Sequence, residues 1–348
     1  MAQGRSLSRI AYSAQTYARV AWYAGHHILA RRMGGPTAFE HRDVKLENKW
    51  PKRDQILRAM RDLFERDWAN IEAGVYSAPD ALDRGAFNTL ARSAAFLRDV
   101  PSVARRRRDR AHDEVLSEEA RAKFPRYYLQ NFHYQSGGWL SEESARIYDF
   151  QVETLFSGTA AAMRRQALVP IAAHLKGRDQ RQFNLLDVAC GTGSFLSLVK
   201  SNWPKLKVTA LDLSPNYIEA ARKTLKPWRD VSFLEANAEA MPVPDASQDI
   251  VTAVFLFHEL PPKIRAAVVH EISRVLKPGG TFVLLDSIQG GDQPGFEALT
   301  ELFPQAFHEP YYDSYLQWDA AAECAAAGLT AVSSAPAYLS KVISFTKA

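Results

Sequence analysis

The chain has 348 residues, with 43 Lys and Arg against 39 Asp and Glu, so its formal net charge is +4 at pH 7. This near balance does not favour nucleic acid as a partner, and a hydrophobic content of 47% permits an ordinary folded core. The length exceeds the ~100 to 200 residues usual for one domain, so we expect a catalytic domain with an appended region. The only cysteines are Cys190 and Cys324. They provide neither a disulfide framework nor a zinc-ligand spacing, which favours a reducing, cytoplasmic setting and predicts no metal site.

The first 39 residues contain five arginines and no acidic residue. Apolar residues that include Ile10 and Tyr17 recur near helical spacing between Leu7 and Ala21, which predicts an amphipathic helix. No apolar stretch in the chain reaches the ~18 residues of a membrane span. The helix can therefore pack on a cap domain, lie on a membrane surface through residues 1–32, or act as an organellar targeting peptide. The sequence leaves these three interpretations open.

Two further helices are predicted in the front half of the chain. Residues 53–73 carry one continuous apolar face, and Gly74 is a plausible stop. A second helical pattern begins at Pro79-Asp80, and we expect Pro101 to end it. The arginine run 105–108 follows without interleaved aromatic residues and is followed at once by acidic residues. We interpret the run as a solvated helix face rather than a nucleic-acid patch.

Residues 124–140 are dense in aromatic residues, amides and glycine and have no helical or strand periodicity, which suits a binding lid. The alternative is aromatic packing between two domains. Ser141 then offers an N-cap for a helix whose apolar stripe includes Tyr148. We therefore divide the chain into a helical N-terminal extension or cap over 1–123, a lid loop with connecting helices over 124–180, and a catalytic domain over 181–348.

From residue 184 onward, short apolar strands alternate with helical patterns. The predicted strands are Leu185–Ala189, Val208–Leu213, Val231–Leu234, Ile250–Phe257 and Phe282–Asp286, followed by Leu329–Ser334 and Tyr338–Phe345. Strands that alternate with helices imply a doubly wound, mainly parallel sheet covered on both faces. The last two strands have no helix between them, so we expect an antiparallel hairpin there. Ligands should bind at the carboxyl ends of the parallel strands.

A glycine-rich loop follows the first of these strands and reads Asp187-Val-Ala-Cys-Gly-Thr-Gly193. Gly191 and Gly193 allow a sharp turn and close approach of a ligand to the backbone. A second strand ends in Asp212, about 20 residues on, where an acid meets ribose hydroxyls. A dinucleotide site usually has a third glycine three residues after the second, but position 196 is Leu. The loop thus indicates a nucleoside cofactor without a pyrophosphate.

These motifs resemble those of class I S-adenosylmethionine-dependent methyltransferases, most closely the branch of ubiquinone and menaquinone biosynthesis methyltransferases (methyltransferase type 11). The loop and Asp212-Leu-Ser-Pro215 are similar to the first two motifs of the family. Glu235-Ala-Asn-Ala-Glu239 is similar to its adenine-binding turn, although Asn237 stands where Asp is usual. Leu276-Lys-Pro-Gly-Gly280 and an upstream Tyr148-Asp149 also fit. The resemblance covers roughly residues 140–348 and implies a seven-stranded sheet with an antiparallel final hairpin.

The resemblance implies S-adenosylmethionine as the cofactor and methyl transfer by in-line displacement. The cofactor-binding residues expected on this basis are Tyr148, Asp187, Ala189, Gly191, Gly193, Asp212, Leu213, Asn237, Ala238 and Phe255. For proton removal from the acceptor, His258 follows the fourth strand, His308 follows the fifth, and His133 comes from the lid. For His258, the alternative is a role in the pocket wall or in hydrogen bonding within the loop.

The acceptor class is narrowed by what the sequence lacks. Pro261-Pro262-Lys263 is not the motif with which amide- and adenine-methylating families grip a planar nitrogen, and no Pro-Cys nucleophile is present. The aromatic lid favours an apolar or aromatic small molecule. Two other functions stay open: an RNA or protein methyltransferase that uses the basic helical N-terminal region, and a protein with this fold that performs no methyl transfer. Neither the methylated atom nor the oligomeric state follows from the sequence.

Overall fold

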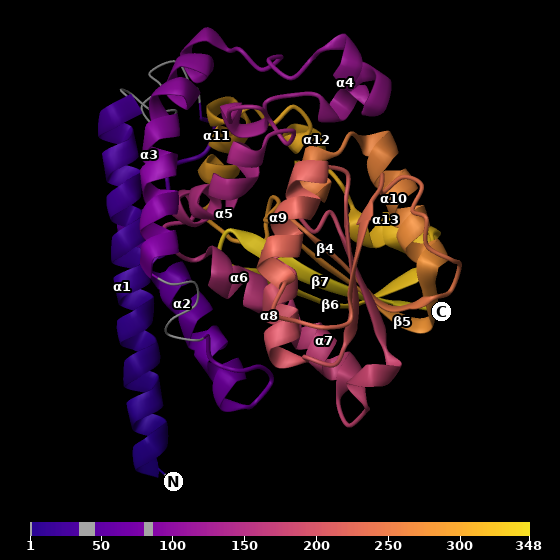
Figure 1. The fold of residues 1–348 in the computed structure, drawn as a ribbon. Helices are drawn as coiled ribbons and strands as arrows, with labels where there is room; N and C mark the ends of the chain where they lie inside the picture. The colour runs from indigo at the N-terminus through magenta and orange to yellow at the C-terminus, as the bar shows by residue number, and fades with distance from the viewer. Residues whose placement is uncertain (1, 35–45, 80–85) are drawn as a thin grey trace.

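The computed structural model describes residues 2–34, 46–79 and 86–348. Its centre is a seven-stranded sheet of order β3-β2-β1-β4-β5-β7-β6 (Figure 1). The strands are β1 (Asn184–Val188), β2 (Lys207–Asp212), β3 (Val231–Glu235), β4 (Gln248–Val254), β5 (Leu276–Ser287), β6 (Leu329–Ala337) and β7 (Ser340–Lys347). Strands β1 to β5 pair in parallel, whereas β7 is antiparallel to both β5 and β6. The predicted doubly wound sheet and its antiparallel end are confirmed.

Helices cover both faces of the sheet because the strands are apolar on both sides. One core contains α7 (Leu168–Leu175), α8 (Ser194–Asn202) and α9 (Pro215–Leu225) against Leu185, Ile250 and Val283. The other contains α10 (Pro262–Val275), α12 (Tyr312–Leu316) and α13 (Ala320–Ala326) against Leu186 and Val251. Adjacent strand residues such as Leu185 and Leu186 therefore point into different cores, as the two-residue strand period requires.

The N-terminal region is helical, as predicted, with α1 (Ala2–Gly34), α2 (Arg53–Glu72), α3 (Ala86–Asp109) and α4 (Glu118–Lys123). Helix α1 runs beside α3 along one side of the molecule (Figure 1). The helices α5 (Glu142–Leu155) and α6 (Ala160–Gln166) lie between this layer and the sheet. The side chain of Ser141 accepts a hydrogen bond from Ser144 N at 3.1 Å, which confirms the predicted N-cap of α5.

Helix α1 packs on the rest of the protein with a face other than the predicted apolar stripe. Tyr12 and Tyr23 are buried, and His26 Nε2 lies 2.7 Å from Ser93 Oγ on α3. Ile10 and Tyr17, which belong to the predicted stripe, are 61% and 72% exposed. The packing of the helix is thus carried by aromatic rings with polar edges, and much of its apolar surface faces outward.

A buried ion pair ties these helices to the connecting helix α6. Asp67 on α2 accepts from Arg165 Nε on α6 at 2.9 Å, and the hydroxyls of Tyr12 and Tyr76 donate to the same carboxylate at 2.5 and 2.8 Å. Asp67 is completely buried. Its charge is balanced by Arg165 and its oxygens are hydrogen-bonded, as a buried carboxylate requires.

Two predictions for this part of the chain are corrected. Helix α3 continues through Pro101 to Asp109, although a proline inside a helix costs about 3 kcal/mol. Packing of α3 against α1 and α5 offsets this cost. The start predicted at Pro79-Asp80 lies largely outside the described residues. In the arginine run, Arg106 turns inward and donates to Tyr134 O at 2.8 Å, so the run is not wholly a solvated face.

Among the described residues, no helix has the length and apolar character to cross a bilayer.

Candidate functional site

The glycine-rich loop leaves the carboxyl end of β1 and turns back within a few residues. Ala189, Gly191 and Gly193 all have positive φ, at 58°, 55° and 74°. Gly191 N donates to Asp212 Oδ2 at 2.8 Å, and Ser214 N donates to Asp212 Oδ1 at 2.8 Å. The carboxylate at the end of β2 is thus fixed next to the loop. The left-handed conformation of Ala189 is strained for a residue with a Cβ, and such strain concentrates at functional sites.

A cavity of about 110 Å³ lies at this edge of the sheet, and a smaller one of about 30 Å³ adjoins it. Both are lined by Tyr148, Ala189, Gly191 and Phe255, and we call the two together the cofactor pocket. The larger part is also lined by Asp212, Leu213, Asn237 and Ala238, and the smaller part by Asp187 and Arg164. Nine of the ten residues predicted to bind cofactor therefore line this pocket.

Gly193 is the exception. It lines neither part of the pocket and stands at the N-cap of α8 with φ at 74°. A Cβ at this position would lie 3.1 Å from Leu225 Cδ1 and 3.3 Å from Ala221 Cα, both on α9. The glycine is required because α9 packs closely against the loop, and it does not contact the pocket.

The lid loop closes the cofactor pocket from above the strand ends. Tyr127, Tyr128, Phe132 and Trp139 all line its larger part. Tyr127 OH donates to Glu239 Oε1 at 2.6 Å, which ties the lid to the turn after β3. The sequence predicted a lid over this stretch without indicating which rings face the ligand. Tyr217 on α9, a further lining residue, was missed because its spacing is that of an ordinary buried helix position.

Charged groups of both signs face the smaller part of the pocket. Burial raises the pKa of Asp187 to about 7, although the Thr252 hydroxyl donates to it at 2.6 Å. Burial likewise raises the pKa of Asp212 to about 6, against the backbone N–H donors of Ser214 and Gly191. Arg164 lines the same space, with NH1 3.9 Å from Asp149 Oδ1. An anionic and a cationic side chain around one small space suit the ammonium and carboxylate of an amino acid.

The three histidines predicted to serve as bases occupy different positions. His258 Nδ1 lies 2.5 Å from Asp286 Oδ1, and the ring is buried. His258 does not line the cofactor pocket, whereas the neighbouring Glu259 does. Burial opposes charge on His258, yet the Asp286 carboxylate raises its pKa to about 9. His133 lines a second cavity, and burial lowers its pKa to about 3.

His308 lines neither the cofactor pocket nor the second cavity. Its ring stacks on His112 with centroids 4.1 Å apart, and its Nε2 lies 2.7 Å from Gln130 Oε1. The lid and the segment after α11 (Glu297–Ala306) hold it there. The neighbouring Glu309 turns inward instead and is 3% exposed. Glu259 and Glu309 are the sequence neighbours of the predicted His258 and His308, but neither glutamate was itself predicted to be a catalytic or cofactor-binding residue.

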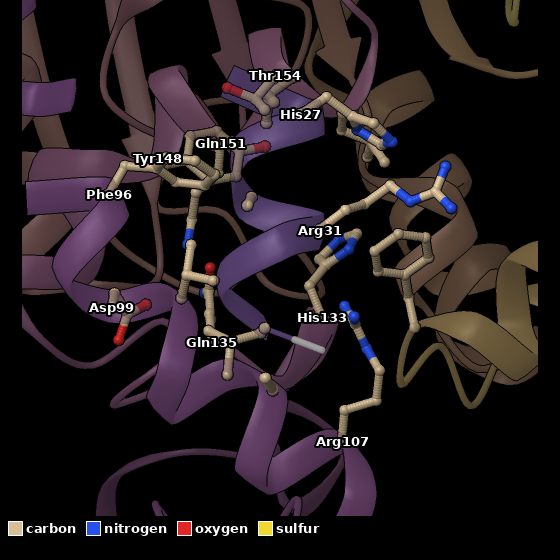
Figure 2. Close-up of a pocket in the computed structure, with 18 of the residues that line it drawn as sticks. His27, Arg31, Phe96, Asp99, Arg107, His133, Gln135, Tyr148, Gln151 and Thr154 are labelled. Carbon is tan, nitrogen blue, oxygen red and sulfur yellow. The ribbon is translucent and has the colours of Figure 1, made fainter. Parts of the chain in front are cut away.

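The second cavity has a volume of about 180 Å³ and lies between α1, α3, α5 and the lid. Figure 2 shows Arg31, His133 and Arg107 along one side of it, with Phe96 and Tyr148 on the other. Arg107 lies 5.3 Å from the ring centroid of Phe307, and its Nε has no hydrogen-bond partner among the described residues. Because Tyr148 lines this cavity and both parts of the cofactor pocket, its ring forms a wall common to them.

Comparison with known proteins agrees with this geometry. Residues 185–280 match the family model described as a methyltransferase domain. A demethylmenaquinone methyltransferase of Listeria welshimeri is 32% identical over 155 residues, covering 41% of this chain and 63% of the relative. A ubiquinone/menaquinone biosynthesis C-methyltransferase of Methylobacterium nodulans is 33% identical over 162 residues, covering 46% and 62%. The chain thus spans somewhat less than two thirds of these relatives.

Among solved structures, an S-adenosylmethionine-dependent methyltransferase from Aquifex aeolicus is 19% identical with a TM-score of 0.39, covering 51% of this chain and 88% of that one. Residues 185–280 are therefore similar to a methyltransferase domain, and the sheet has the order and the antiparallel end expected of class I S-adenosylmethionine-dependent methyltransferases. The matching part of the chain is also similar to the ubiquinone and menaquinone methyltransferases, and S-adenosylmethionine is the cofactor that this similarity supports.

Proposed function

We propose that the protein transfers the methyl group of S-adenosylmethionine to an apolar or aromatic small molecule bound in the second cavity. The observation that carries the proposal is the position of Tyr148, which borders both that cavity and the cofactor pocket. An acceptor there would lie next to the cofactor, between α1, α3, α5 and the lid. Methyl transfer depends mainly on alignment of the acceptor with the cofactor and on exclusion of water, because the sulfonium is already a strong electrophile.

The lining of the second cavity favours a ring that carries oxygen substituents. Its volume of about 180 Å³ exceeds the ~150 Å³ of an apolar cavity that holds benzene. Val100, Val103 and Leu155 give it apolar walls, while Arg107 supplies a guanidinium for a carbonyl or ionised hydroxyl oxygen. The names of the curated relatives agree with a quinone-like ring, so a quinol or naphthol is the acceptor class we propose.

The polar side chains proposed to lie near the acceptor are those where the cofactor pocket and the second cavity adjoin. Glu259 reaches the cofactor pocket and His133 reaches the second cavity. In this proposal they orient the acceptor oxygen by hydrogen bonds. His258, which was predicted as a base, has a positioning role, since its ring is held by Asp286 and stands beside Glu259 with Nε2 3.9 Å from Oε1.

The test is incubation of the protein with methyl-labelled S-adenosylmethionine and a panel of quinols, naphthols and a lipid-plus-metabolite extract. We expect label in an apolar product identified by mass spectrometry. Label in RNA or protein, together with binding that weakens steeply with salt, would favour the macromolecular alternative. Cofactor binding without any labelled product from the panel or extract would contradict methyl transfer to a small molecule.

The place of the acceptor is tested by filling the second cavity. Val103→Trp should abolish transfer while leaving the affinity for S-adenosylhomocysteine unchanged, because Val103 lines only the second cavity. The matched control is Val332→Trp on β6, because the Val332 side chain is 67% exposed. Unchanged turnover in Val103→Trp, or equal losses in both variants, would place the acceptor elsewhere.

We further propose that the outward face of α1 contacts an anionic membrane surface. Ile10, Tyr17, Trp22 and Ile28 are exposed on this helix, which contains arginines and no acidic residue. Apolar side chains with flanking arginines suit the headgroup region of an anionic bilayer. Binding to vesicles with and without phosphatidylserine is the test. Ile10→Asp combined with Ile28→Asp should release the protein, and equal vesicle binding by parent and variant would refute the contact.

A further inference from the structure

Three side chains from distant parts of the sequence meet where the cofactor pocket and the second cavity adjoin. His133 belongs to a short 3-10 turn of the lid, η3 (Phe132–Tyr134), and Glu259 ends the turn after β4, η5 (Phe257–Glu259). Glu309 lies between α11 and α12. One ring nitrogen or carboxylate oxygen from each lies within 4.8 Å of the others. His133 Nε2 and Glu309 Oε1 are 3.0 Å apart.

Glu309 has the surroundings expected of a ligand for a cation. Its side chain is 0% exposed. Neither carboxylate oxygen accepts a hydrogen bond from any described residue. A buried carboxylate without a hydrogen-bond donor costs several kcal/mol, and burial next to a metal ion is one of the few ways to offset that cost. At least one of its oxygens is therefore available to a cation next to His133 and Glu259.

The groups around the three side chains hold them in place. Asp286 accepts from His258 Nδ1 at 2.5 Å and from Phe257 N at 2.7 Å, so the turn that carries Glu259 is anchored at the end of β5. His133 is held by a backbone with φ at 54°, and it lies in edge contact with Phe303 and Phe307. Fixed side chains with supporting hydrogen bonds behind them are typical of metal centres.

We propose that His133, Glu259 and Glu309 bind one divalent transition-metal ion. One imidazole nitrogen and two carboxylates are donors that Zn²⁺, Fe²⁺ and Mn²⁺ accept in proteins. Three protein ligands leave at least one position open, as in catalytic rather than structural sites. No short sequence spacing announces the site because its members are separated by 126 and 50 positions, from 133 to 259 and from 259 to 309.

The open position fits an oxygen of the acceptor. His133 lines the second cavity and Glu259 lines the cofactor pocket, so an ion between them would border both. The ligand class is a ring with a hydroxyl or carbonyl oxygen, held through that oxygen and oriented toward the cofactor. This role rests on the proposed function, whereas metal binding by the three residues does not.

The test uses the full, tag-free chain stripped with a chelator and dialysed. Binding of Zn²⁺ and of Mn²⁺ is measured by calorimetry, and the bound metal by elemental analysis. We expect one equivalent of at least one of the two ions per chain. Glu309→Gln and His133→Gln should each weaken its binding at least tenfold, whereas Glu143→Gln, which alters an exposed pair with Arg146, should not. Unchanged circular dichroism and thermal melting verify folding, and Glu259→Gln replaces any variant that fails this criterion.

Two results would overturn the metal site: no stoichiometric binding of either ion by the parent chain, or unchanged affinity in the Gln variants. These outcomes are separate from those for the proposed function. Stoichiometric metal with no labelled product from any acceptor would support the site and contradict the proposed function. Labelled product from a chain that binds no metal would support the function and contradict the site.

Discussion

Asp212 accepts a hydrogen bond from the backbone N–H of Gly191 at 2.8 Å, so the end of β2 and the glycine-rich loop form one rigid edge of the cofactor pocket. The carboxylate also accepts from Ser214 N, at the N-cap of α9. The Asp212 side chain thus joins the loop after β1 to the first turn of α9, the helix after β2. It retains lone pairs for ribose hydroxyls, since a carboxylate has about four acceptor positions.

Replacing this carboxylate should remove cofactor binding. Asp212→Ala loses the ribose acceptor and also releases Gly191, so we expect at least a hundredfold loss of affinity for S-adenosylmethionine in calorimetry. His258→Ala serves as the matched comparison, because His258 is buried at similar depth but lies outside the cofactor pocket. That variant should bind cofactor normally and turn over slowly. Equal loss of affinity in both variants would contradict the assignment.

Cofactor affinity should rise with pH between about 5 and 7. Burial raises the pKa of Asp187 to about 7, so below that pH the carboxyl is largely protonated and cannot pair with the ammonium of S-adenosylmethionine. Asp212, with a pKa raised by burial to about 6, acts in the same direction at lower pH. Ionisation of Asp187 on binding releases a proton, and affinity should change by up to about tenfold per pH unit.

The measurement is calorimetry at pH 6 in buffers of different ionisation enthalpy, which reports proton release directly. Asp187→Asn should bind more weakly at pH 7 and release fewer protons at pH 6. If the parent chain releases no proton at pH 6, or if Asp187→Asn has the same pH profile, Asp187 does not carry the pH dependence.

The parts of the site that the sequence predicted are those encoded by short, contiguous patterns. The loop from Asp187 to Gly193 and the strand ending in Asp212 carry local signals, because a sharp turn after a buried strand requires glycine at fixed positions. The antiparallel end of the sheet followed from two strand patterns with no helix between them. For these features, local chemistry and tertiary structure agree.

The features that were missed or mistaken depend on which segments come together in space. Glu309 stands beside His308 in a segment expected after the fifth strand, but only the fold brings its carboxylate to His133 and Glu259. On α1, apolar spacing identified the helix but not its packed face, because Tyr12 and His26 pack through polar edges as well as rings. Likewise, Pro101 by itself favours the end of a helix, but the packing of α3 against α1 and α5 outweighs that local preference.

The close packing of Gly193 is open to a test with a matched glycine. Gly177 has nearly the same φ, at 73°, but a Cβ there would meet nothing within 4 Å. Gly177→Ala should therefore cost only backbone strain, about 1 kcal/mol of unfolding free energy. Gly193→Ala should cost more and weaken cofactor binding, because Leu225 and Ala221 must move away from the loop. Equal denaturation midpoints and equal cofactor affinities for the two variants would show that packing against α9 is not limiting.

The ion pair between Asp67 and Arg165 should be required for the N-terminal helices to stay docked. Asp67→Asn leaves Arg165 buried without a counter-charge and weakens the bonds from Tyr12 and Tyr76, so we expect a loss of about 3 to 5 kcal/mol in urea denaturation. The matched control is Asp54→Asn on the same helix, whose pair with Arg58 is exposed and should matter little. Limited proteolysis should cut α1 and α2 free faster in Asp67→Asn than in the control. If both variants unfold at the parent's urea concentration, the docking of α1 and α2 rests on apolar contacts such as Tyr12 with Trp68 and not on the ion pair.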